Sequence, residues 1–96
     1  MNPGRYRCHA AKIGSRLIAP AIVTVSQNGS IDIAPYTHEV MATVDLDGVL
    51  LVVPEDCSSP LPDAIPLRGA HEFLRALDLP DPSGGKAVPL LLPFRL

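Results

Sequence analysis

An Asn-Gly pair between two apolar runs constrains the fold of this chain more than any other feature of its sequence. Asn28 and Gly29 lie in the polar segment Gln27–Ser30, directly after the apolar run 16–26. Both residue types tolerate positive φ, and an Asn-Gly pair between β-branched runs is typical of a type I′ hairpin. The sequence therefore predicts a strand over 16–26 that turns tightly into an antiparallel partner over 30–34.

A second glycine turn, Asp47-Gly48, separates two further apolar runs. Residues 38–45 alternate as a half-buried strand does, and residues 49–53 are apolar at every position, as in a strand covered on both faces. Asp-Gly again favours a tight hairpin. Residues 5–13 also begin with strand-like alternation. Consecutive strands joined by tight turns predict an antiparallel meander of about five strands.

The second half of the chain has a different character. Residues 54–66 contain four prolines and predict an irregular loop. Residues from about 67 to 78 place apolar side chains at helical spacing, and Pro80 would end that helix. Residues 87–96 are very apolar but contain two prolines, which predict an edge strand or an extended segment. The expected fold class is α+β, a mainly antiparallel sheet with one helix and a C-terminal extended segment.

Size and charge limit the possible functions. The chain has 96 residues, 47% of them hydrophobic, so residues 1–96 are expected to form a single small β-rich domain. The net charge of −2 argues against general nucleic-acid binding. Residues 1–31 hold four basic and no acidic residues, whereas residues 32–96 hold four basic and ten acidic ones. Either a basic edge strand that prevents aggregation or a patch for an acidic partner explains this asymmetry.

The sequence contains no membrane or secretion signal that we recognise. No apolar run approaches the ~18 residues that a membrane helix needs. The run Leu17–Val25 is interrupted by Pro20 and is followed by no cleavage site, so it predicts a strand. Cys8 and Cys57 form no metal-binding pair and are expected to be reduced thiols, with one disulfide as the alternative in a secreted protein. The cytoplasm is the expected location.

The chemical motifs that the sequence suggests are incomplete. Residues 45–48 overlap a calcium-loop pattern, but Pro54 stands where that loop needs glutamate. The pairs His38-Glu39 and His71-Glu72 belong to no zinc motif, and the chain has no nucleophile elbow. No catalytic residue, metal or cofactor is therefore predicted. The sequence favours a non-enzymatic role and leaves open whether there is any activity.

Surplus apolar surface suggests association as the function. The runs 16–26, 49–53 and 87–96 offer more apolar surface than one short helix covers, and a symmetric dimer is the simplest way to bury the rest. The favoured function is thus a non-enzymatic association module, a homodimer or a subunit of an assembly, with a well-wrapped monomer as the alternative. The expected contact residues are Leu90, Leu91, Leu92 and Phe94 at the centre and Arg5, Arg7 and Arg16 at the rim.

The competing hypothesis is a small-ligand-binding protein or a minor enzyme. Its site would lie between the sheet and the helix and would be lined by Tyr36, His38, Glu39 and His71. Convergence of the two histidines on one ion or water would favour an enzyme, and separated rings would argue against one.

One segment has a loose resemblance to a known family. Residues 17–53 contain an apolar strand, an Asn-Gly turn, Ile-x-Ile, Pro-x-x-x-Glu and then Thr-Val-Asp-x-Asp-Gly-Val-Leu. This order is similar in rhythm to the small β-sandwich that flanks amidohydrolase barrels. The resemblance rests on no specific motif, and the metal-binding histidine pairs of that family are absent from the sequence.

Overall fold

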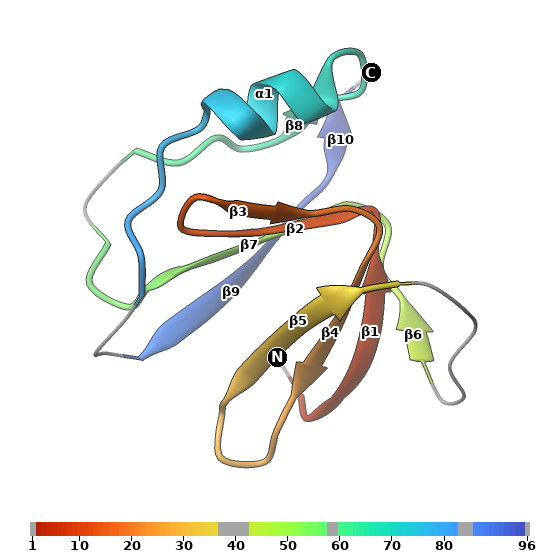
Figure 1. Cartoon of the computed structure of the whole chain (residues 1–96), viewed down its shortest axis with the longest axis vertical. Helices are drawn as coiled ribbons and strands as arrows, with labels where there is room; N and C mark the ends of the chain where they lie inside the picture. Colours follow the sequence, from red (N-terminus) through yellow and green to blue (C-terminus); the bar gives the residue numbers. More distant parts are fainter. Residues whose placement is uncertain (1, 37–42, 58–59, 83–85, 96) are drawn as a thin grey trace.

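The computed structural model of the chain describes residues 2–36, 43–57, 60–82 and 86–95, and most of its regular structure is β-sheet (Figure 1). These ranges contain ten strands and one helix. The elements are β1 (Gly4–Cys8), β2 (Ala10–Ile13), β3 (Arg16–Ile18), β4 (Ala21–Val25), β5 (Ile31–Pro35), β6 (Thr43–Asp45), β7 (Val49–Pro54), β8 (Ile65–Pro66), α1 (Ala70–Ala76), β9 (Ala87–Leu92) and β10 (Phe94–Arg95). The expected α+β class is confirmed.

The strands form two four-stranded sheets and one two-stranded pair. The first sheet has the order β5-β4-β1-β6, the second has the order β3-β2-β7-β9, and β10 pairs with β8. Neighbours are antiparallel except for β1–β6, β2–β7 and β8–β10, which are parallel. The expected meander of about five strands is therefore too simple, because parallel pairs join strands that lie far apart in the sequence.

Both long strands predicted in the N-terminal part are divided between the two sheets. The run 5–13 becomes β1 and β2, with a bend at His9, and the run 16–26 becomes β3 and β4, with a bend at Ala19 and Pro20. Proline has no N–H to donate, so a ladder ends readily beside it. The chain thus crosses from the first sheet to the second and returns within twenty residues of sequence.

One further prediction is confirmed, and two other predicted ranges differ in detail. The predicted edge strand in the apolar run 87–96 is confirmed, because the described part of this run forms β9, an outer strand of the second sheet, and then β10 beyond Pro93. The expected loop 54–66 contains β8 at its end. The expected strand 38–45 lies partly outside the described residues, and its described end is β6.

The Asn-Gly hairpin is confirmed between β4 and β5, with a different turn. The N–H of Ser26 donates to the oxygen of Ser30 at 2.9 Å, and the N–H of Gly29 donates to the oxygen of Ser26 at 3.0 Å. Three residues therefore span the turn, not the two of a type I′ turn. Gly29 has a φ of 88°, which is the left-handed conformation that a three-residue hairpin loop requires.

The Asp47-Gly48 turn is not the predicted hairpin. β6 pairs with β1 and β7 pairs with β2. The segment β6–β7 therefore runs parallel to the segment β1–β2, and both bend at the same place. At this corner the N–H of His9 donates to the oxygen of Gly48 at 3.1 Å, and the N–H of Leu46 donates to the oxygen of Arg7 at 2.7 Å. The hairpin prediction is wrong because β7, apolar on both faces, belongs inside a sheet that is covered on both sides.

Two apolar clusters lie on opposite faces of the second sheet, and β7 contributes to both. The first cluster contains the buried residues Cys8, Ala11, Ala21, Val23, Val25, Leu50 and Val52. The second contains the buried residues Ala10, Val49, Leu51, Val53, Ile65, Leu74 and Leu79. The first sheet covers one face of β7 and α1 covers the other, so the apolar pattern of residues 49–53 is satisfied within the chain (Figure 1).

The helix is shorter than the predicted range 67–78. It spans Ala70–Ala76 and begins after Gly69, whose φ of 71° places this residue outside the helical region. Leu74 is its buried residue, and the chain becomes extended at Leu77. Within the part of the chain that the structure describes, no helix is long and apolar enough to span a membrane.

Candidate functional site

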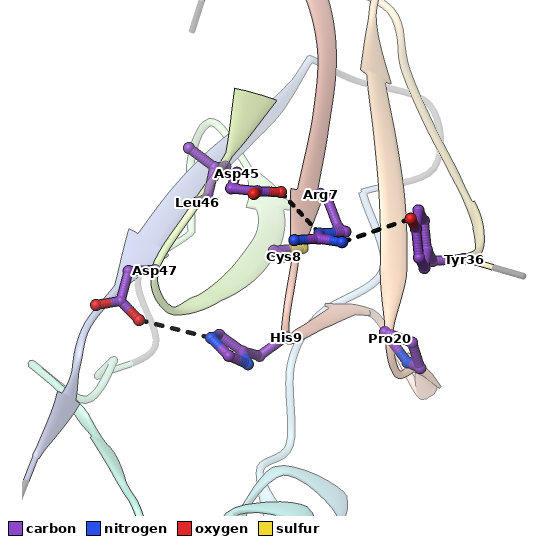
Figure 2. Close-up of a pocket in the computed structure, with 8 residues that line it drawn as sticks. All are labelled: Arg7, Cys8, His9, Pro20, Tyr36, Asp45, Leu46 and Asp47. Atoms are coloured by element: carbon purple, nitrogen blue, oxygen red, sulfur yellow. Dashed lines mark hydrogen bonds and ion pairs between the residues drawn. The ribbon is translucent and has the colours of Figure 1, made fainter. Parts of the chain in front are cut away.

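A pocket of about 470 Å³ opens where β1 bends into β2, beside the neighbouring corner between β6 and β7 (Figure 2). It combines charged groups, an aromatic ring and small apolar side chains. Its lining residues are Arg7, Cys8, His9, Pro20, Tyr36, Asp45, Leu46 and Asp47. The volume lies within the range of about 300–1,000 Å³ that small-molecule pockets occupy.

Arg7 is held from two sides at the wall of this pocket. Its Nε donates to Oδ1 of Asp45 at 2.7 Å, and its Nη1 donates to the hydroxyl of Tyr36 at 3.4 Å. The guanidinium carbon lies 5.1 Å from the centre of the Tyr36 ring, within the range of a cation–π contact. The hydrogen bond to Tyr36 and the negative charge of Asp45 raise the pKa of Arg7. Arg7 is thus a fixed cation whose position two neighbours define.

The sheet ladder explains why these three side chains meet. Arg7 stands opposite Asp45 in the parallel pair β1–β6, so their side chains point to the same face of the first sheet. Tyr36 follows β5 directly, and its N–H donates to the oxygen of Pro20 at 3.0 Å. This bond fixes the end of β5 beside the bend of β3 into β4.

His9 and Asp47 form a second, looser pair at the same corner. Nε2 of His9 lies 3.5 Å from Oδ1 of Asp47, whose side chain is 98% exposed. The His9 ring also meets the Phe94 ring edge to face, with centroids 5.1 Å apart. Because Asp47 is surrounded by solvent, this pair contributes little to stability and leaves its carboxylate available to a ligand.

Cys8 closes the inner side of the pocket as a buried thiol. Its Sγ lies 4.0 Å from the oxygen of Ala21, and the residue belongs to the first cluster. Burial raises the pKa of Cys8 to about 11, although backbone hydrogen bonds from Leu50 and Ala10 oppose the shift. Since a thiolate is the reactive form of cysteine, Cys8 is protonated and a poor nucleophile at neutral pH.

The predicted ligand-site residues are only partly brought together. Tyr36 lines the pocket, whereas His71 is exposed on α1 and is not among the lining residues. His38 and Glu39 lie outside the described residues. No group of three or more His, Cys, Asp or Glu side chains within the described ranges could hold a metal ion.

The residues predicted as an interface lie in different surroundings. Leu90, Leu92 and Phe94 pack against the second cluster of their own chain, while Leu91 is 44% exposed. Arg5 and Arg16 are exposed, and Arg7 is engaged in the pocket.

Sequence reasoning did not assign His9, Asp45 or Asp47 to a ligand site. A usable signal was present, because Arg7 and His9 have the same two-residue spacing as Asp45 and Asp47. On neighbouring strands such spacing places each basic side chain beside an acid. The expected hairpin at Asp47 pairs β6 with β7 and not with β1, so it does not bring these acids beside Arg7 and His9.

Comparisons of the chain with family models, with curated proteins and with solved structures find no match.

Proposed function

We propose that this chain is a non-enzymatic binding protein whose site is the Arg7 pocket and whose ligand is a small amine with an apolar body. One observation carries the proposal. Asp45 and Asp47 line a pocket in which Arg7 is the one lysine or arginine, so the carboxylates outnumber the guanidinium group of the lining by one. A cationic ligand restores neutrality, because opposite charges at contact distance attract even near a protein surface.

The geometry also supports a role for each wall of the pocket. Arg7 engages one oxygen of Asp45 and so holds that carboxylate in place, while Asp47 remains open to solvent. Leu46 and Pro20 offer apolar contacts beside these acids. Fixed polar groups on an otherwise apolar wall are the usual means by which a pocket orients a small molecule. The high pKa of Cys8 supports binding without covalent chemistry.

Three probes of similar shape and different charge test this proposal. Benzylamine, benzyl alcohol and benzoate are titrated into the full chain, and the backbone amide signals of His9, Leu46 and Asp47 are followed by NMR. We expect saturable shifts at these amides with benzylamine, weaker shifts with benzyl alcohol and none with benzoate. Equal shifts with benzoate and benzylamine would overturn the proposal, as would the absence of saturable shifts with all three.

Two variants sharpen the same experiment. Asp47→Asn removes an exposed carboxylate of the pocket and should weaken benzylamine binding about two- to fivefold, as for an exposed ion pair. Asp32→Asn is the matched control, because Asp32 is also exposed but does not line the pocket. If both variants bind benzylamine as the original chain does, Asp47 is not a ligand-binding residue and the charge argument fails.

A second candidate function is association with a second copy of the chain, as a homodimer or within an assembly. β5 is an outer strand of the first sheet, and within the described residues it pairs on one side alone. Exposed edges of this kind can add a strand from another chain. The apolar argument is weaker, since the large exposed apolar side chains of the described residues lie in separate parts of the chain: Val44 on β6, Leu67 between β8 and α1, and Leu91 on β9.

Light scattering after size exclusion tests this candidate at two protein concentrations. A stable mass of twice the chain would support association, and the mass of one chain at both concentrations would exclude it.

The cytoplasm remains the proposed location, a setting in which cysteines stay reduced, as Cys8 is here.

A further inference from the structure

The parallel pair β8–β10 carries a second hollow that shares no lining residue with the Arg7 pocket. This groove has a volume of about 360 Å³ and is lined by Pro66, Leu67, Arg68 and Arg95. Arg95 stands opposite Pro66 in the ladder, and the N–H of Leu67 donates to the oxygen of Arg95 at 3.1 Å. Backbone pairing thus brings two arginines from distant parts of the sequence to one groove.

The two arginines of the groove lack the acidic partner that Arg7 has. Arg68 and Arg95 are exposed, and neither forms an ion pair with any residue in the described ranges. The carboxylate of Glu72 lies beside Gly69 but does not pair with Arg68. Two guanidinium groups at one groove create a positive potential, and their planar arrays of donors match carboxylate and phosphate oxygens.

The groove also offers an apolar surface next to these charges. Leu67 is 53% exposed, and Pro66 is half-buried. An inorganic anion would leave Leu67 in water, whereas an anion with an apolar group would cover it. We propose that this groove binds a small organic anion, in which a carboxylate or phosphate group is attached to an apolar body.

The proposal is independent of the Arg7 pocket, and the ligand charge distinguishes the two sites. Phenyl phosphate, benzoate, inorganic phosphate and benzyl alcohol are titrated into the full chain, with the amides of Leu67 and Arg68 and the side-chain Nε–H of Arg95 followed by NMR. We expect saturable shifts with phenyl phosphate and benzoate, smaller ones with inorganic phosphate and none with benzyl alcohol. Added salt should weaken the binding, because both arginines are exposed.

Charge variants identify the groups responsible. Arg68→Gln and Arg95→Gln should each weaken phenyl phosphate binding about three- to tenfold, as expected for the net contribution of one solvent-exposed hydrogen bond. Arg16→Gln is the matched control, because Arg16 is exposed and lines neither hollow. Glu72→Gln removes the nearby negative charge and should strengthen the binding.

Three results would overturn the proposal. The first is unchanged affinity in both Arg68→Gln and Arg95→Gln, and the second is equal binding of benzyl alcohol and benzoate. The third is the absence of a saturable shift with both phenyl phosphate and benzoate. If a peptide rich in Asp and Glu then binds, the groove is instead a docking site for an acidic protein segment.

Discussion

Among the glycines that the structure describes, Gly48 is the one at which an added methyl group would meet the closest obstacle. Its φ is 152°, and a Cβ built there would overlap the carbonyl oxygen of Leu92 on β9. Because the obstacle is backbone, no side-chain rotation relieves it. We predict that Gly48→Ala lowers the free energy of unfolding by about 2–4 kcal/mol, the sum of backbone strain and overpacking. Urea unfolding measures the change.

Gly29→Ala is the control for this substitution. Gly29 also has a positive φ, of 88°, but no heavy atom lies within 4 Å of a Cβ placed there. Its replacement should cost about 1 kcal/mol, from the left-handed conformation alone. An equal loss in both variants would contradict the close approach of Gly48 to β9.

The buried thiol of Cys8 predicts a dependence of stability on pH. Its pKa is about 11 in the folded chain, whereas an unfolded cysteine titrates at about 8.5. Because folding raises this pKa, the thiol's contribution is fully present below about pH 8.5 and is lost as the pH rises toward about 11. Urea unfolding over this window should show falling stability, with a shallower fall for Cys8→Ala.

At the scale of elements, the sequence predicted the features that depend only on residues close together in the chain. The Asn28-Gly29 turn, the helix around Leu74 and the edge position of 87–96 follow from φ preference, apolar spacing and proline content. The pairing of β1 with β6 and of β2 with β7 could not be predicted in this way. Each pair joins segments far apart in the sequence, and the alternation within one strand does not specify its partner. The pocket depends on that pairing, so its acids were missed.

The two faces of β9 give a prediction at the same scale. Leu92 packs against the second cluster, whereas Leu91 is 44% exposed. Leu92→Ala should therefore lower the free energy of unfolding by about 2 kcal/mol, and Leu91→Ala by less than about 1 kcal/mol. Urea unfolding of both variants measures the difference. A similar loss in both would show that β9 does not present these faces.

The same pair of variants bears on the predicted interface of the C-terminal segment. If a second copy covers Leu91, Leu91→Ala should reduce the solution mass, while the separated chain keeps most of its stability. An unchanged mass would argue against an interface at this segment. Packing against the second cluster would then account for Leu90, Leu92 and Phe94.

At the scale of the whole molecule, β7 connects the two apolar clusters. Leu50 and Val52 belong to the first cluster, and Val49, Leu51 and Val53 belong to the second. Loss of either cluster removes the cover from one face of this central strand. Exposure of the apolar surface of β7 to water is unfavourable, so loss of one cluster should destabilise the other.

We therefore predict that the chain unfolds as one cooperative unit, as a single domain over residues 1–96 would. Val23→Ala in the first cluster and Leu74→Ala in the second should both shift the same transition, each by about 2 kcal/mol or more. Tyrosine fluorescence, which reports on Tyr6 and Tyr36 in a chain without tryptophan, should coincide with far-UV circular dichroism during urea unfolding. If Leu74→Ala produced an early loss of helical signal while the tyrosine transition stayed in place, α1 and its cluster would be a separate folding unit. The shared strand would then not couple the two faces of the sheet.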